Sequence, residues 1–299
     1  MTLPNFLIIG AAKAGTTTLH AYLRPHPQVF MPARKELRFF AYGGTGDDYN
    51  YPVKTLEEYE RYFADAGDAR AIGEATPRYL RTPAAAGRIK ALIPECRLIV
   101  SLRNPVDQSF SAYLMDLRNG RLAPGTSYLA AIEEHPNFLR GYAADLETYF
   151  GLFDRSLFHI IRFEDLARDE RAVARGLYGF LGVATDFVPE VERVANPGGL
   201  PKNRLLHRIL ADKRVVNFGK RYLPERLLDK AKVVRNDNLE KKRMAPEERA
   251  VAMAALREDI LRTGELVGQD LSAWLRQPES KETGMETGAG PGAPAGTRA

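Results

Sequence analysis

A glycine-rich segment near the N-terminus combines residue types that bind phosphate. The chain reads GAAKAGTTT over residues 10–18, at the end of the apolar run FLIIG. Glycines permit a tight turn, the backbone N–H groups at a helix start favour an anion, and threonine hydroxyls add donors. An ordinary strand-to-helix turn has no need of a lysine and three threonines together. The predicted anion-binding residues are Lys13, Ala14, Gly15, Thr16, Thr17 and Thr18.

The lysine of this segment does not lie where nucleoside triphosphatases have theirs. In a G-x-x-x-x-G-K-[ST] loop the lysine follows the second glycine, whereas here Thr16 follows Gly15. The later apolar run RLIVSL leads into Arg103, where an aspartate would complete a magnesium site. The pattern predicts a nucleotide with phosphate at two places and no magnesium requirement. A small-molecule kinase with an altered loop is the alternative reading.

Arg103 begins the second anion-binding pattern, SLRNPVDQSFSAYL. Asn104 suits a helix cap and Pro105 suits the first helical position, so Arg103 lies just before a helix start. A guanidinium group there can make a forked contact with phosphate. Ser111 follows eight residues after Arg103, roughly two helical turns, and returns near the same helix face. The pair Arg103 and Ser111 therefore predicts a second anion pocket.

These residues must be positioned by an α/β framework. Short apolar runs without polar alternation, typical of strands buried on both faces of a parallel sheet, occur at 6–10, 71–74, 97–103 and 157–163. Helical patterns occur at 15–24, 55–64, 82–93, 105–119, 140–153, 164–181 and 246–275. The alternation predicts a central parallel sheet flanked by helices, with a helical C-terminal part and ligands beyond the carboxyl ends of the strands.

Length and composition limit the remaining possibilities. The chain has 299 residues, 44% of them hydrophobic, and we expect one domain over residues 1–276 followed by a disordered tail at 277–299 that is rich in Gly, Pro, Glu and Thr. The single cysteine, Cys96, excludes an internal disulfide framework and favours a reducing compartment. Without a transmembrane or leader pattern, we expect a cytoplasmic protein. The histidines show no metal-ligand spacing, so no metal is expected.

The positive charge is concentrated in one stretch. Between Lys202 and Arg243, fourteen Lys and Arg residues face five Asp and Glu residues. Such a stretch attracts phosphates, sulfates, acidic glycans or an anionic membrane surface, although a solvated helical face explains it as well. It lacks a nucleic-acid-binding motif, so nucleic acid is not an expected partner. Oligomeric state has no sequence signal.

Together, the two anion-binding patterns resemble the sulfotransferases that use 3′-phosphoadenosine 5′-phosphosulfate (PAPS). The resemblance covers most of residues 4–210 and includes KELRFF at 35–40, GEATPRYL at 73–80, GYAADLETYFGLF at 141–153 and RFEDL at 162–166. It is closest to the bacterial and glycan-modifying branch. The resemblance implies a P-loop-like sulfotransferase fold, with Lys13 and its loop holding the 5′-phosphosulfate and with Arg103 and Ser111 holding the 3′-phosphate.

The same resemblance suggests which residue removes the proton of the acceptor. Glycan sulfotransferases carry a similar K-E-x-x-F-F segment whose glutamate is the implied general base, which corresponds to Glu36. Lys35 and Arg38 flank it and could bind sulfate or stabilise the departing nucleotide. Glu74 is the alternative base, or else it orients Thr76 and Tyr79. Some relatives have a lysine in place of Ala75, so Lys13 or Arg38 is left to supply that charge.

The adenine end and the acceptor are less defined. A segment similar to residues 196–210 closes over the nucleotide in bacterial relatives, which implies Gly199, Lys202 and Arg204 as further contacts. The predicted reaction is in-line sulfuryl transfer from PAPS, with 3′-phosphoadenosine 5′-phosphate (PAP) as product, to a hydroxyl of a carbohydrate or natural-product acceptor. A non-catalytic anion-binding module is the alternative from another class. Both His20 and His26 are expected to have structural roles.

Overall fold

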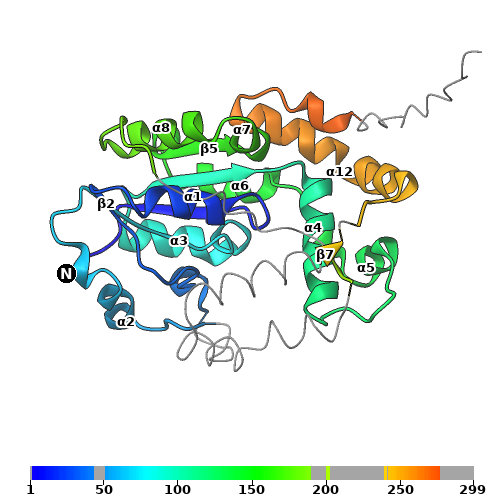
Figure 1. Ribbon diagram of the computed structural model, residues 1–299, viewed down its shortest axis with the longest axis horizontal. Coiled ribbons are helices and arrows are strands. Elements are labelled where there is room, and N and C mark those ends of the chain that lie inside the picture. Colours follow the sequence, from blue (N-terminus) through cyan, green and yellow to red (C-terminus); the bar gives the residue numbers. More distant parts are fainter. Residues whose placement is uncertain (1, 44–50, 190–199, 203–238, 241, 277–299) are drawn as a thin grey trace, which may run out of the picture.

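A five-stranded parallel sheet forms the centre of the molecule in the computed structural model (Figure 1). The structure describes residues 2–43, 51–189, 200–202, 239–240 and 242–276. The strands are β1 (Phe6–Gly10), β2 (Val29–Phe30), β3 (Ala71–Ala75), β4 (Arg97–Leu102) and β5 (Phe158–Arg162), in the spatial order β2-β3-β1-β4-β5. The predicted α/β class and parallel sheet are confirmed. The two-residue strand β2 was not predicted, because it is too short to produce a sequence pattern.

Helices follow the strands as the sequence predicts. The helices are α1 (Thr16–Leu23), α2 (Leu56–Arg61), α3 (Pro83–Leu92), α4 (Pro105–Arg118), α5 (Tyr128–Glu134), α6 (Ala143–Phe150), α7 (Phe163–Arg168), α8 (Glu170–Leu181) and α12 (Pro246–Val267). The pattern at 164–181 is two helices, α7 and α8, rather than one, and α5 was not anticipated. A short antiparallel pair joins β6 (Leu200–Pro201) to β7 (Leu239–Glu240).

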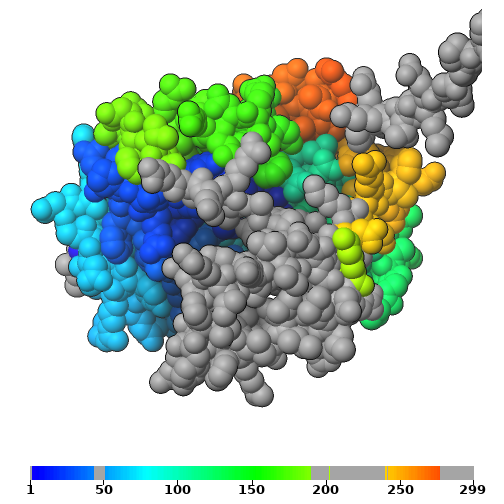
Figure 2. Space-filling view, viewed as in Figure 1, coloured from blue at the N-terminus to red at the C-terminus, as the bar shows by residue number. Residues whose placement is uncertain are grey.

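Side chains of the central strand alternate between two cores. Leu7 and Ile9 pack with α3, α4, α6 and α12, whereas Phe6 and Ile8 pack with α1 and α8. The continuous apolar run of β1 is therefore explained by burial on both faces. In the space-filling view, the blue N-terminal residues lie beside the green segment that contains α7 and α8 (Figure 2), in agreement with the contact between α1 and α8.

The strand order gathers the predicted site at one edge of the sheet. Strand β1 lies between β3 and β4, and all three run in the same direction. Their carboxyl ends lead into the GAAKAGTTT loop, the TPRYL segment and the Arg103 turn, respectively. Ligands bind in such α/β sheets beyond the carboxyl ends of the strands, where the order changes direction.

Candidate active site

The backbone of the loop between β1 and α1 is held by side chains from β4, from α4 and from the turn between them. Its three consecutive carbonyl oxygens each accept a hydrogen bond. The donors are Gln108 Nε2 to Ala12 O at 2.9 Å, Arg103 Nη1 to Lys13 O at 3.1 Å, and Ser101 Oγ to Ala14 O at 2.5 Å. Within the described residues, no acceptor pairs with the amide N–H groups of Lys13, Gly15, Thr16 and Thr17. The loop therefore has its carbonyls satisfied and its amides available to an anion.

Gly15 permits this conformation. Its φ is +83°, in the left-handed region, and it directly precedes the first residue of α1. A Cβ at this position would lie 2.6 Å from Leu166 Cδ2 and 3.1 Å from a ring carbon of Phe163. Glycine is required here because it adopts a positive φ without strain and because a side chain would collide with α7.

Lys13 projects from the loop toward α4. Its Nζ lies 3.8 Å from the sulfur of Met115. Burial lowers the pKa of the Lys13 ammonium, and the charges of Arg118 and Arg103 lower it further. Like charges and desolvation both disfavour the protonated form, so an anion bound here would relieve an existing electrostatic cost.

Arg103 joins the two predicted anion pockets. One guanidinium nitrogen holds the carbonyl of Lys13, as described above, and the guanidinium carbon lies 4.7 Å from the centre of the Phe163 ring. Such stacking fixes the plane of the group. The carbonyl of Arg103 itself accepts from the hydroxyl of Tyr142 at 2.9 Å. The two residues predicted to bind opposite ends of one nucleotide are therefore in direct contact.

Ser111 lies on the face of α4 that contacts the loop. Gln108 and Met115, which touch the loop at Ala12 and Lys13, precede and follow it by three and four residues. Residues with this spacing share one side of a helix. Ser111 is half-buried on that side, on the same helix whose start Arg103 precedes.

The segment after β2 contributes the predicted base. Among the described residues, the non-glycine residues with positive φ are Lys13 (66°), Glu36 (59°) and Arg38 (60°). All three are predicted site residues. A left-handed conformation disfavours L-residues, and such residues cluster at functional sites because the surrounding structure must enforce them. The strain therefore points to the same positions as the sequence motifs.

Hydrogen bonds to the end of β3 enforce this backbone. The amide of Glu36 donates to the carbonyl of Ala75 at 3.0 Å, and the amide of Arg38 donates to the hydroxyl of Thr76 at 3.3 Å. Arg38 Nη2 then pairs with the Glu36 carboxylate at 2.5 Å. The Glu36 side chain is 41% exposed, so its carboxylate remains accessible to a substrate hydroxyl.

Glu74 lies in the interior, beneath Glu36 and Arg38. The residue is 1% exposed, and its carboxylate accepts from Tyr59 OH at 3.1 Å, Tyr79 OH at 2.6 Å and Thr76 Oγ1 at 2.7 Å. Burial raises the pKa of Glu74, although these hydrogen bonds act in the opposite direction. Because Thr76 in turn holds the amide of Arg38, the geometry fits the orienting role better than the role of base.

The two N-terminal histidines make hydrogen bonds to the backbone. His20 Nε2 lies 3.2 Å from Pro32 O, and burial lowers the pKa of His20 to about 4. His26 accepts from Gln28 N at Nδ1 at 3.1 Å, so its Nε2 carries the proton and donates to Ala184 O at 2.9 Å. Both are buried, and both hold loops as the structural interpretation predicts.

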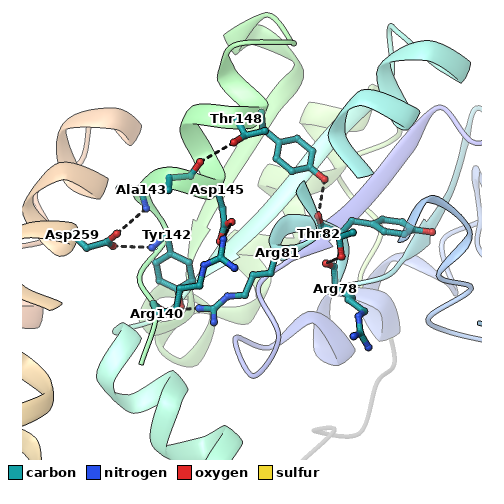
Figure 3. A network of polar contacts seen from close by, with 12 residues as sticks. Arg78, Arg81, Thr82, Arg140, Tyr142, Ala143, Asp145, Thr148 and Asp259 are labelled. Carbon is teal, nitrogen blue, oxygen red and sulfur yellow. Dashed lines mark hydrogen bonds and ion pairs between the residues drawn. The ribbon is translucent and has the colours of Figure 1, made fainter. Parts of the chain in front are cut away.

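A polar network around Arg81 supports the loop. Arg81 donates to the carbonyl of Arg140 at 2.8 Å (Figure 3). It also donates to Gln108 Oε1 at 3.3 Å. Gln108 carries this support to Ala12 in the loop. In Figure 3, Asp259 of α12 also points its carboxylate at the amides of Tyr142 and Ala143. The C-terminal helix is thereby connected to the site.

Sequence reasoning missed the residues that shape the loop. Ser101, Gln108 and Phe163 contact the loop or Arg103, yet none was singled out. Ser101 and Gln108 are buried polar residues within otherwise apolar surroundings. A polar residue in a strand such as RLIVSL is the signal that could have revealed Ser101.

Other predicted positions are described in part or not at all. Gly199 and Arg204, and most of the basic stretch after Lys202, lie outside the described residues. Lys202 is exposed and follows β6, which contacts α4. Among the described residues, no group of three or more His, Cys, Asp or Glu side chains could hold a metal ion. None of the described helices combines the length and apolarity needed to cross a membrane.

The parallel sheet, the loop after its central strand and the helix that follows define a P-loop-like α/β protein with an anion-binding site. A sequence profile of the sulfotransferase family matches residues 48–187. The crystal structure of a sulfotransferase from Alicyclobacillus acidocaldarius superimposes with a TM-score of 0.70 and 28% identity, over 92% of this chain and 100% of that one. The chain is therefore similar to sulfotransferases in sequence over residues 48–187 and in fold over 92% of its length.

Curated relatives match over shorter stretches. A membrane-associated sulfotransferase of Dictyostelium discoideum is 36% identical over 116 residues, which is 38% of this chain and 23% of that protein. Human heparan sulfate glucosamine 3-O-sulfotransferase 6 is 30% identical over 188 residues, which is 60% of this chain and 52% of that protein. The chain thus spans about a quarter of the first relative and about half of the second.

Proposed function

We propose that the protein transfers the sulfuryl group of PAPS to a hydroxyl group of a carbohydrate or natural-product acceptor, without a metal. PAPS supplies an activated sulfuryl group bonded to a 5′-phosphate oxygen. The observation that carries the proposal is the contact between the two predicted anion pockets, where Arg103 Nη1 donates to Lys13 O at 3.1 Å. One adenosine with phosphate at both its 3′ and 5′ positions matches this arrangement better than a metal-bound triphosphate does.

The residues of the loop would bind the 5′ end of this nucleotide. The free amides of Gly15, Thr16 and Thr17 would bind one anion, and the ammonium of Lys13, from the same loop, would add a further donor. Thr18 lies on the first turn of α1, where its hydroxyl adds a further donor. Together they would stabilise negative charge on the leaving phosphate oxygen. Arg103 and Ser111 would bind the 3′-phosphate, with Gly199, Lys202 and Arg204 as further contacts of the nucleotide.

Glu36 is the proposed general base. Its carboxylate is accessible, and Arg38 and the end of β3 fix its position. It would accept the proton of the acceptor hydroxyl as that oxygen forms its bond to sulfur. Glu74 is proposed as a positioning residue, since its hydrogen bond to Thr76 supports the amide of Arg38. The heparan sulfate relative favours a carbohydrate acceptor.

The test compares nucleotides and variants. We expect calorimetry to show magnesium-independent binding of PAP and no comparable binding of ATP with magnesium. Glu36→Gln should lower kcat for sulfuryl transfer by roughly a hundredfold or more while PAP affinity is kept, as expected on losing a general base. An altered kinase would instead bind ATP with magnesium. A non-catalytic anion-binding module would bind PAP but transfer no sulfuryl group to any acceptor in a screen with labelled PAPS.

A further inference from the structure

A second lysine reaches the anion-binding loop from a different part of the chain. Lys35 lies in the segment after β2, and its Nζ donates to Thr17 Oγ1 at 3.0 Å. Thr17 is the second residue of α1, whose N-terminus faces the loop. The ammonium of Lys35 therefore lies beside the same free amides that surround the proposed 5′ anion.

This position is electrostatically unfavourable without a ligand. Lys35 is half-buried and lies within ion-pair distance of no carboxylate among the described residues. The helix N-terminus beside it carries a positive partial charge, and Lys13 belongs to the same loop. Burial lowers the pKa of Lys35 to about 8, and the charge of Glu36 only partly opposes this.

The groups around Lys35 leave part of its hydrogen-bonding capacity unused. His20 faces Lys35 from α1 and stays neutral at physiological pH, because its own pKa is about 4. Thr17 uses only one of the three N–H donors of the ammonium group. Two donors remain, at a place where the nearby groups are amides, hydroxyls, cations and the carboxylate of the adjacent Glu36.

We propose that Lys35 binds the phosphosulfate group of the donor directly, as a second lysine of the site beside Lys13. The inference rests on the proposed sulfotransferase function and assigns a further catalytic residue to it. During transfer, the acceptor oxygen forms a bond to sulfur and gives its proton to Glu36. The bond between sulfur and the bridging phosphate oxygen breaks, and its electron pair stays on that oxygen. Lys35 and Lys13 would stabilise the resulting negative charge.

Lys35→Met tests the proposal, because the substitution keeps most of the length and apolar stem of the side chain. We expect its affinity for PAPS in the absence of acceptor to fall about tenfold to a hundredfold, the effect of losing a charged hydrogen bond. Lys35→Arg should retain part of the affinity. If PAP affinity falls equally, Lys35 contacts the 5′-phosphate; if only PAPS affinity falls, it contacts the sulfuryl group. Either result supports the proposal.

Arg34 provides the matched control. It precedes Lys35, is exposed, and donates to Tyr62 OH at 3.3 Å, so Arg34→Met removes one positive charge from the same segment but not from the loop. We expect Arg34→Met to bind PAPS and PAP within about twofold of the wild-type protein, in keeping with the small effect of exposed charges.

Thermal unfolding separates a binding role from a structural one. Because Lys35→Met removes a partly buried cation that lacks a carboxylate partner, the ligand-free variant should unfold at the same or a higher temperature than the wild-type protein. Saturating PAPS should then raise that temperature less than in the wild-type protein. Wild-type affinity for both nucleotides in Lys35→Met would overturn the inference while leaving the proposed function intact. Failure of the wild-type protein to bind PAP would instead refute the proposed function.

Discussion

At the residue scale, backbone strain and charge identify the site more directly than any single motif. Lys13, Glu36 and Arg38 are left-handed, and each is anchored by a neighbouring strand end or helix. Sequence motifs predicted all three positions. The conformations could not be predicted, because they are imposed by partners such as Ala75 and Arg103, which are distant in the chain.

His20 makes a prediction about pH. Its pKa falls from 6.5 to about 4 in the folded protein because of burial, so the unfolded chain binds a proton more readily. The stabilisation from keeping His20 neutral is complete above pH 6.5 and is lost as the pH falls toward 4, at a cost of at most about 3 kcal/mol. His20→Gln, whose amide can still donate to Pro32 O, should therefore show a flatter loss of stability between these pH values in urea denaturation.

His135 serves as the control for this measurement, since its side chain is 50% exposed. His135→Gln should follow the pH dependence of the wild-type protein. Identical curves for all three proteins would show that His20 is not kept neutral by the fold.

At the scale of elements, the loop depends on one glycine and on three side chains from β4, from α4 and from the turn between them. Of the four predicted strands, β1, β3 and β4 were recognisable because burial on both faces requires continuous apolar runs, whereas β5 has an apolar run although it is an edge strand and mostly half-buried. The helices were recognisable by their period and their caps, as for α4, where Asn104 accepts from Val106 N at 3.0 Å. The side-chain contacts to the loop carbonyls could not be recognised from the sequence, because they join residues about ninety positions apart.

Gly15→Ala tests the loop. The added Cβ meets Leu166 and Phe163 in a left-handed residue, so we expect a loss of several kcal/mol of stability and a fall in PAP affinity of roughly two orders of magnitude. Gly182→Ala is the matched control, because Gly182 also has a positive φ, 71°, but nothing lies within 4 Å of the added Cβ. It should lose only about 1 kcal/mol and keep its PAP affinity. Equal effects of the two substitutions on binding would contradict the role of Gly15 in shaping the loop.

At the scale of the whole molecule, the C-terminal helix α12 braces the elements behind the site (Figure 1). Arg249 pairs with Asp107 of α4, and Arg262 pairs with Glu147 of α6 at 2.9 Å. Beyond α12, the carbonyl of Trp274 accepts from Asn104 Nδ2 at 2.9 Å, next to Arg103. The predicted helical C-terminal part thus shares the core of the sheet. The extent of the domain, 1–276, and the tail stay predictions.

Asp259 makes this bracing testable. Its carboxylate accepts from the amides of Tyr142 at 2.8 Å and Ala143 at 3.2 Å, so it caps α6 from another helix. A Cβ on Gly141 would lie 1.7 Å from Asp259 Oδ1. We expect Gly141→Ala to cost about 2 kcal/mol or more in the wild-type protein but less than about 1 kcal/mol in Asp259→Ala, measured by a double-mutant cycle. Additive costs would show that the two helices are not coupled at this point.

The grouping of Lys13, Lys35 and Arg103 around one short loop has a practical consequence. Burial of Lys13 and Lys35 and the repulsion between Lys13 and Arg103 favour occupancy by whatever small inorganic anion is abundant, so the resting protein in a phosphate-containing medium would carry phosphate or sulfate in place of nucleotide. Donor binding is then an exchange rather than a simple addition. The apparent dissociation constant should accordingly be larger in phosphate or sulfate buffer than in a zwitterionic buffer of the same ionic strength.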